Sequence, residues 1–154
     1  MDQIEEDEKM IALGSDHGGY DCKQVVIAYL EEKGIEYKDF GTYDTNSCDY
    51  PIFGKKAAEA VASGECEKGI VICTTGIGIS IVANKVKGIR CALCSEPHSA
   101  RLTREHNDAN MLAMGGALIG PGMVVDIVDT FLNTPFSGLE KHSRRISEIA
   151  DMEE

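Results

Sequence analysis

Short apolar segments alternate with amphipathic segments along this chain, and this alternation limits the possible folds more than any other feature. Five segments have the length and apolar content of buried strands, namely residues 10–13, 36–40, 69–73, 89–93 and 111–114. The segments between them have helical spacing of apolar residues, with Pro51 at a helix start and Gly34 and Gly64 at helix ends. Strands that alternate with helices are typical of a parallel sheet covered on both faces. We therefore predict a single doubly wound, Rossmann-like α/β domain with a five-stranded parallel sheet and helices on both faces.

Length and charge narrow the class of protein. With 154 residues, the chain is most simply one domain over residues 10–150 that ends in a basic helix starting near Lys141, preceded by a disordered acidic leader over residues 1–9. The net charge of -11 argues against binding to nucleic acid or to an anionic membrane. No segment is long and apolar enough to span a membrane, and the leader lacks the basic and apolar regions of a signal peptide. We therefore expect a cytoplasmic protein.

Six cysteines are scattered along the chain. Cys91 and Cys94 have C-x-x-C spacing, but they lie on a predicted strand, where residues three apart point to opposite faces. Such a pair cannot readily share a metal ion or form a disulfide. No two histidines have the i, i+4 spacing with a carboxylate that a zinc site needs. The sequence thus favours reduced, mostly structural thiols and predicts no metal site.

The polar residues that follow the predicted strands are the candidate functional groups. In a parallel α/β sheet a ligand binds beyond the carboxyl ends of the strands, where the pair Asp16-His17, the segment Cys73–Gly78 and the residues after Leu93 would lie. This arrangement also predicts that the His106 segment lies near Cys73. Backbone N–H groups at a glycine-rich turn before a helix bind anions and favour the thiolate form of a neighbouring cysteine. Taken alone, however, the segment Cys73–Gly78 slightly favours a structural role for Cys73, as a small buried residue at the end of a strand, over a catalytic one.

Each of the other polar segments has a structural alternative. Asp16 either caps the next helix or binds hydroxyl groups, and His17 either is an exposed loop residue or binds phosphate. The segment Arg104–Asn110 carries groups that bind or protonate oxygen, but it also fits a helix C-terminus. The basic cluster Lys141–Arg145 fits a solvated helix face or a phosphate ligand. Gly76-Ile77-Gly78 lacks the spacing of a nucleotide-binding loop, which leaves the binding of a simpler anion.

Taken together, six segments resemble the ribose-5-phosphate isomerase B family. They are Gly14–Gly19, Asp49–Pro51, Cys73–Gly78, Ala83–Lys85, Gly88–Arg90 and Arg104–Asn110, and the resemblance runs in order from Met10 to Ile149. The family is also similar to isomerases of allose 6-phosphate and galactose 6-phosphate. Because the galactose 6-phosphate branch lacks the Asp-His pair and the cysteine, the presence of Asp16, His17 and Cys73 favours ribose 5-phosphate as the substrate.

The resemblance implies a reaction and a role for each matching residue. Family members interconvert ribose 5-phosphate and ribulose 5-phosphate through a cis-enediolate, without a metal or cofactor. By resemblance, the catalytic residues are Cys73 as the base, Thr75 beside it, His106 as the group that opens the sugar ring, and Asp16 on the sugar hydroxyls. The substrate-binding residues would be Asp16, His17, Thr74, Thr75, Gly76, Ile77, Gly78, Asn107, Lys141 and Arg145. The family builds each active site from two subunits, which implies a homodimer or homotetramer with shared sites.

Three positions depart from the family pattern. Thr74 stands where the family usually has glycine, which would be unfavourable if that position needs a positive φ. Ala117 stands where an arginine that binds phosphate is expected, and Lys141 replaces a second arginine. Fewer arginines predict weaker phosphate binding, since lysine is only a point charge. Two alternatives therefore stay open: an isomerase of a six-carbon sugar phosphate, and a binding module that holds a phosphorylated ligand without chemistry.

Overall fold

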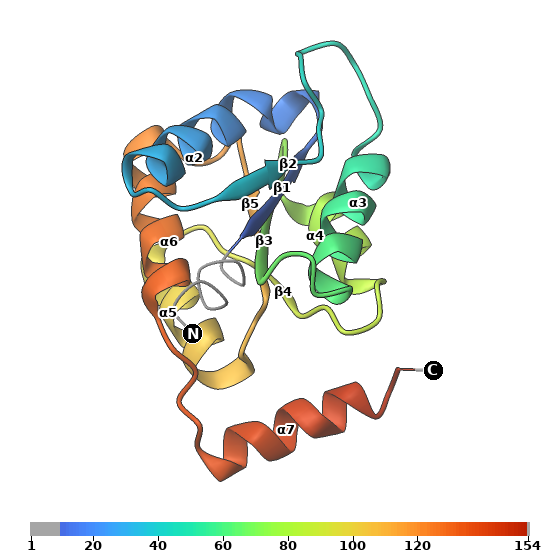
Figure 1. Ribbon diagram of the computed structural model, residues 1–154, viewed down its shortest axis with the longest axis vertical. Coiled ribbons are helices and arrows are strands. Elements are labelled where there is room, and N and C mark those ends of the chain that lie inside the picture. The colour runs from blue at the N-terminus through green and yellow to red at the C-terminus, as the bar shows by residue number, and fades with distance from the viewer. Residues whose placement is uncertain (1–9, 154) are drawn as a thin grey trace.

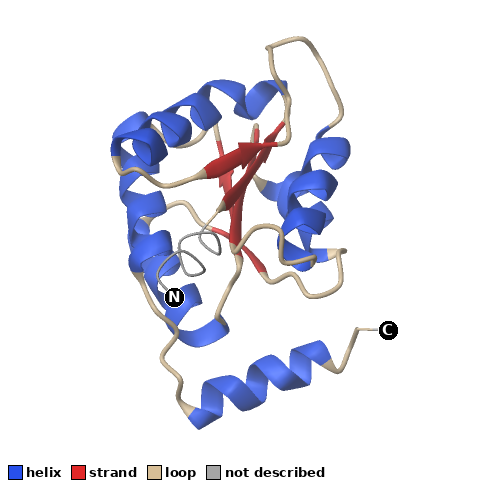
Figure 2. Cartoon of the chain, in the orientation of Figure 1, coloured by secondary structure: helices blue, strands red, loops and turns tan. Residues whose placement is uncertain are grey.

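The computed structural model describes residues 10–153, which are built around one parallel β-sheet (Figure 1, Figure 2). The five predicted strands are present as β1 (Ile11–Ser15), β2 (Tyr37–Asp39), β3 (Lys68–Cys73), β4 (Cys91–Leu93) and β5 (Met111–Gly115). They pair in parallel in the order β2-β1-β3-β5-β4. The predicted fold class is confirmed, whereas the acidic leader predicted over residues 1–9 lies outside the described residues.

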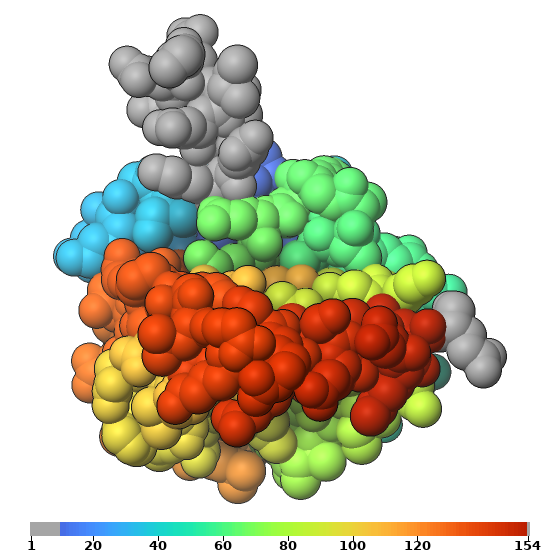
Figure 3. All heavy atoms as spheres, turned by 90° about the horizontal axis from the view of Figure 1, so that it is seen from below, coloured from blue at the N-terminus to red at the C-terminus, as the bar shows by residue number. Residues whose placement is uncertain are grey.

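Helices cover both faces of the sheet, as predicted. On one face lie α2 (Tyr20–Glu32), α5 (Pro97–Asn107) and α6 (Pro121–Asn133), and on the other lie α3 (Tyr50–Ala62) and α4 (Ile77–Asn84). A short 3-10 helix, η1 (His17–Gly19), joins β1 to α2. The last helix, α7 (Glu140–Ala150), lies apart from these layers and crosses the lower end of the molecule, as the view from below in Figure 3 shows. Within residues 10–153, no helix is long and apolar enough to cross a membrane.

The central strands are apolar on both sides because each side meets a layer of helices. Successive residues of a strand point to opposite faces, so Ile70 and Ile72 of β3 pack with α2, α5 and α6, whereas Val71 and Cys73 pack with α3 and α4. These side chains are almost fully buried. Cys91 and Cys94 likewise lie on opposite sides of the sheet, as their spacing predicts, and both are free thiols.

The parallel sheet has two ends that carry different residues. The carboxyl ends of the strands form what we call the carboxyl edge, which includes Ser15, Cys73 and Gly115. The chain after α5 lies at the opposite end, the amino edge, because the Asn110 N–H donates to the carbonyl of Arg90, just before β4 begins. The expectation that the His106 segment lies near Cys73 is therefore wrong within one chain. The length of β3 alone separates the two edges by about 16 Å, at 3.3 Å per residue.

Candidate active site

Cys73 ends β3 and begins a tight loop. Its side chain is 4% exposed, and its Sγ accepts a hydrogen bond from the Gly76 N–H over 3.2 Å. Gly76 has a φ of 78°, and a Cβ at this position would lie 2.6 Å from the Leu93 side chain. Both conformation and space therefore require glycine here. The turn holds the Cys73 sulfur against a backbone N–H at the N-terminus of α4.

The first turn of α4 presents further backbone N–H groups near Cys73. Thr75 Oγ1 accepts a hydrogen bond from the Ile77 N–H over 3.3 Å, and the first helical bond runs from Ser80 N to Gly76 O over 3.1 Å. The N–H groups of residues 78 and 79 precede that bond, so the helix itself gives them no acceptor. The positive end of the helix dipole adds to their attraction for an anion. We call residues 74–79 the α4 cradle.

Thr74 fits into this loop without a positive φ, because Asp108 is the only non-glycine residue with a positive φ between residues 10 and 153. The Thr74 hydroxyl lies against Gly18, where a Cβ would collide with it. The conformational problem that the sequence raised for Thr74 does not arise. Its carbonyl accepts a hydrogen bond from the Ala117 N–H over 3.1 Å. Ala117, the position without the expected arginine, therefore lies directly beside the α4 cradle.

Asp16 and His17 lie at the carboxyl edge, in the loop that follows β1. Asp16 is 5% exposed, and its Oδ1 accepts a hydrogen bond from the Gly19 N–H over 3.0 Å, so it caps η1 as its structural alternative predicts. His17 is exposed, and its Nδ1 accepts a hydrogen bond from the Cys48 N–H over 3.2 Å. Because the Nδ1 lone pair is occupied, a neutral His17 carries its proton on Nε2. From there it can donate a hydrogen bond to an anion.

Tyr50 and Lys23 also lie at the carboxyl edge, and the sequence alone predicted no role for either residue. The Tyr50 ring, at the start of α3, packs so closely on Gly78 that a Cβ there would lie 2.6 Å from Cζ. Lys23 is fully buried in α2, and its ammonium pairs with Asp39 over 2.7 Å. The sequence does indicate that Lys23 is buried. Lys23 comes three residues before Val26, so the two side chains lie on the same apolar face of α2.

His106 and Asn107 end α5 at the amino edge. The buried Arg104 holds this helix end, donating to Asp108 Oδ1 over 2.8 Å and to the Ala109 carbonyl over 2.7 Å. Asp108 is the C-cap of the helix, with a φ of 45°. The segment is thus a helix C-terminus, as its structural alternative predicts. The residues His106 and Asn107 are both exposed.

Helix α7 contacts α5 through two stacked histidines. The ring centroids of His106 and His142 lie 4.5 Å apart, with the ring planes inclined by 35°. His142 is 8% exposed, and Ser137 Oγ lies 2.7 Å from its Nδ1. In the sequence, His142 is only one member of the basic cluster Lys141–Arg145. The structure shows that it packs directly on His106.

Two basic side chains of α7 are available to an anion. Lys141 and Arg145 are exposed and form no ion pair with any residue between 10 and 153. Arg144 instead pairs with Glu140 over 2.9 Å and with Glu148 over 3.8 Å. Because Lys141 and Arg145 are four residues apart, they lie on the same face of the helix.

Comparison with known proteins identifies the family. The sequence matches the family described as Ribose/Galactose Isomerase over residues 11–149. The chain belongs to this family. The ribose-5-phosphate isomerase B of Escherichia coli is 45% identical over 146 residues, which cover 95% of this chain and 97% of that relative. The galactose-6-phosphate isomerase subunit LacB of Clostridium acetobutylicum is 43% identical over 143 residues, which cover 93% of this chain and 83% of that relative.

A solved structure of a ribose/galactose isomerase has the same fold. The ribose-5-phosphate isomerase B of Clostridium thermocellum superposes with a TM-score of 0.91 at 52% identity. The superposition covers 93% of this chain and 96% of the other. Our chain is therefore an isomerase of the ribose/galactose isomerase family.

Burial makes three other cysteines of this isomerase poor bases. It raises the pKa of Cys22 and Cys94 to about 11 and that of Cys91 to about 12. These thiols stay protonated at neutral pH, and none of them lies at the α4 cradle. Cys73 is the cysteine at that position. Between residues 10 and 153, no three His, Cys, Asp or Glu side chains are grouped so that they could hold a metal ion.

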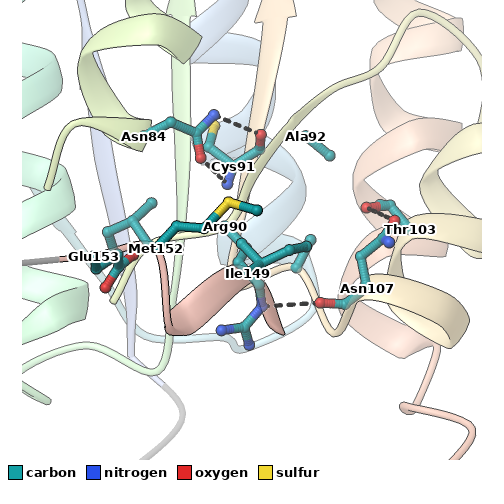
Figure 4. A pocket seen from close by; sticks show the side chains of 11 residues that line it. Asn84, Arg90, Cys91, Ala92, Thr103, Asn107, Ile149, Met152 and Glu153 are labelled. Atoms are coloured by element: carbon teal, nitrogen blue, oxygen red, sulfur yellow. Dashed lines mark hydrogen bonds between the residues drawn. The ribbon is translucent and has the colours of Figure 1, made fainter. Parts of the chain in front are cut away.

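A cavity of about 500 Å³ lies at the amino edge rather than at the α4 cradle (Figure 4). It is lined by β4, the end of α5 and apolar side chains near the end of the chain. Arg90 lies in its wall and donates from Nε to the Asn107 carbonyl over 2.9 Å. The cavity includes Asn107 but neither Asp16 nor Cys73, so it does not join the two sets of candidate residues within one chain.

We expect His142 to titrate below the ordinary histidine pKa of 6.5. Desolvation lowers its pKa first, and His106, Lys141 and Arg145 lower it further, while Glu105 acts in the opposite direction. The folded state therefore favours neutral His142 more than the unfolded state does. Its contribution to stability is complete above pH 6.5 and is lost as the pH falls from 6.5 through the lower folded-state pKa. An NMR titration with His142→Gln for assignment measures this pKa, and a midpoint above 6.5 contradicts the expectation.

Proposed function

We propose that this isomerase interconverts D-ribose 5-phosphate and D-ribulose 5-phosphate, with Cys73 as the base. The observation that carries the proposal is the Cys73 sulfur, which lies 3.2 Å from the Gly76 N at the entrance to the α4 cradle. A base next to an anion site is the arrangement that removal of a proton from carbon requires. Relatives named ribose-5-phosphate isomerase B, at 45% and 52% identity, support this choice of substrate.

In the proposed reaction, Cys73 moves the same proton twice. Its thiolate removes the proton from C2 of the open-chain aldose, the electrons of the broken C–H bond form the C1–C2 double bond, and O1 takes up the negative charge. The thiol then returns the proton to C1, and the hydroxyl proton of O2 moves to O1, which leaves the ketone. The backbone N–H groups of the α4 cradle would stabilise the charge on O1, which develops only during the reaction. Thr75 would help to hold and activate the thiolate.

His106, Asp16 and Asn107 would prepare the sugar for this step. His106 would open the furanose ring by taking the proton of the anomeric hydroxyl and delivering a proton to the ring oxygen. Asp16, with one oxygen bonded to the Gly19 N–H, would use the other for the sugar hydroxyls. Asn107 would bind a further oxygen of the sugar. Cys73 moves the proton between C2 and C1, His106 moves the protons of ring opening, and the scheme uses no metal and no cofactor.

The proposed roles of His17, Cys73, His106 and α7 call for a site that is shared by two subunits. His17 would bind the phosphate from the carboxyl edge, and Lys141 and Arg145 would bind it from α7. Cys73 is separated from His106 and α7 by the length of β3, about 16 Å, which is too far for one sugar phosphate to contact both groups closely. We therefore propose a homodimer or homotetramer in which each site takes Cys73 from one copy and His106 from another.

One alternative substrate has specific support. The 43% identical LacB subunit, named for galactose 6-phosphate, keeps a six-carbon substrate open. Ala117 beside the α4 cradle removes one expected phosphate ligand, which a longer substrate could accommodate. The module that binds a phosphorylated ligand without chemistry has no such support, because the chain belongs to a family of isomerases.

Cys73→Ala is expected to lower isomerisation by about 10²–10⁴-fold, the usual contribution of a general base. Incorporation of solvent deuterium at C2 of ribose 5-phosphate, followed by NMR, should fall equally, while calorimetric binding of the sugar phosphate is retained. Cys66→Ala is the matched control, because Cys66 is equally buried on the same side of the sheet but precedes β3 and so lies at the amino edge, away from the cradle. Exchange by Cys73→Ala at the wild-type rate means that another group is the base.

Mixing two inactive variants tests the shared site. We expect Cys73→Ala and His106→Asn each to be inactive alone, and an equal mixture that has exchanged subunits to regain about a quarter of wild-type activity, because half of the dimers are mixed and each has one intact site. Mass spectrometry confirms the subunit exchange. If both residues acted within one subunit, the exchanged mixture would stay inactive.

Parallel assays on ribose 5-phosphate, allose 6-phosphate and galactose 6-phosphate test the substrate. We expect the highest kcat/KM with ribose 5-phosphate. Ala117→Arg should lower KM for the preferred substrate by up to about tenfold, since a bidentate arginine adds up to about 1.4 kcal/mol of phosphate binding. A large preference for either hexose phosphate overturns our choice of substrate.

A further inference from the structure

Lys23 is a fully buried charge that the proposed mechanism does not use. Its ammonium pairs with Asp39 Oδ1 over 2.7 Å and donates to the Thr42 carbonyl. The rings of Tyr20 and Tyr43 lie 5.7 Å and 5.6 Å from it. A buried charge is costly unless it is paired and hydrogen-bonded, and here both conditions are met.

The partners of Lys23 connect it to the residue directly before Asp16. Thr42 N donates to the Ser15 carbonyl over 2.7 Å, and Ser15 N donates to the Gly41 carbonyl over 2.8 Å. Asp39 Oδ1 also accepts the Gly41 N–H over 2.9 Å. The ammonium therefore fixes the first turn of the β2–α3 loop, residues 40–49, against the carboxyl end of β1. Figure 1 shows this loop at the top of the molecule, between β2 and α3.

The same loop reaches the candidate site at its other end. Residues 43–47 are exposed, and then the Cys48 N–H donates to His17 Nδ1 over 3.2 Å. The loop leads into α3 at Tyr50, whose ring packs on Gly78 of the α4 cradle. Lys23 thus anchors one end of a loop whose far end contacts His17 and the α4 cradle.

We propose that Lys23 is a positioning residue for the phosphate site. By holding residues 41 and 42, it sets the path of the β2–α3 loop, and through Cys48 that loop keeps His17 turned with Nε2 toward the ligand. The role in phosphate binding rests on the proposed function, whereas the effect on the loop does not. A purely structural ion pair would stabilise the fold without setting the orientation of His17.

The test compares three variants of the full-length protein. Lys23→Met removes the ammonium group. The double variant Lys23→Met/Asp39→Asn also removes the negative charge of Asp39, which would otherwise be unpaired, and keeps an oxygen that accepts the Gly41 N–H. Lys68→Met is the matched control, since Lys68 is a partly buried lysine that pairs with Glu67 over 3.5 Å at the amino edge.

In both Lys23 variants we expect amide hydrogen exchange of residues 41–49 to rise about tenfold while β5 keeps its protection. KM for the sugar phosphate should rise about tenfold with kcat within about threefold, the pattern of lost ground-state binding. Lys68→Met should change neither quantity. The NMR shifts of the His17 ring should move in the Lys23 variants and not in the control.

The double variant separates positioning from stability. If it has wild-type exchange over residues 41–49, wild-type His17 shifts and wild-type KM, Lys23 is only a structural ion pair and the proposal is overturned. If the wild-type protein turns over none of the sugar phosphates, the proposed function fails. The His17 shifts then decide the positioning role on their own: a change in them supports it and unchanged shifts overturn it.

Discussion

The parallel pairing of β3 with β1 and β5 is the constraint on which the rest of this structure depends. It brings Cys73 level with Gly115 and next to the end of β1, so the loops that follow these strands gather at one edge. It also sends each connecting helix back toward the other edge, because a crossover between parallel strands must return to the start of the next strand. His106, at the end of such a helix, is therefore kept away from Cys73 by topology. The proposed sharing of sites between copies follows from this separation.

Buried cations fix irregular backbone at both edges. Among the described residues, Lys23 and Arg104 are the buried cations, and each donates to a loop carbonyl, that of Thr42 at the carboxyl edge and that of Ala109 at the amino edge. Loop carbonyls lack the hydrogen-bond partners that neighbouring strands or a helix provide. An ammonium or guanidinium group that is paired with an aspartate can donate a hydrogen bond to such a carbonyl in place of water. In this way the fold gives the exposed candidate side chains a rigid base at each edge.

The order of strands and helices could be predicted because each element is locally consistent, with apolar runs for strands and glycine or proline at the ends of helices. The loop after Cys73 was equally readable, since Gly76 marks its turn. The predicted position of His106 was wrong, because a segment between a helix and the next parallel strand lies at the amino edge. Contacts such as those of Lys23 with Asp39 and of His17 with Cys48 join distant parts of the chain through tertiary packing, and no local pattern encodes them.

Under the proposed function, the absence of an arginine at position 117 gives His17 a larger share of the phosphate binding. Ala117 is hydrogen-bonded to Thr74, so a side chain there would stand beside the α4 cradle, but alanine brings no charge. The lysine at position 141 contributes charge without the planar geometry of a guanidinium. Under the proposed function, the directional contacts to phosphate then fall to Arg145 and to the Nε2–H of His17. If the Cys48 contact sets the direction of that N–H, as we propose, the binding of the substrate is tied to the packing of the β2–α3 loop, which contributes no catalytic residue.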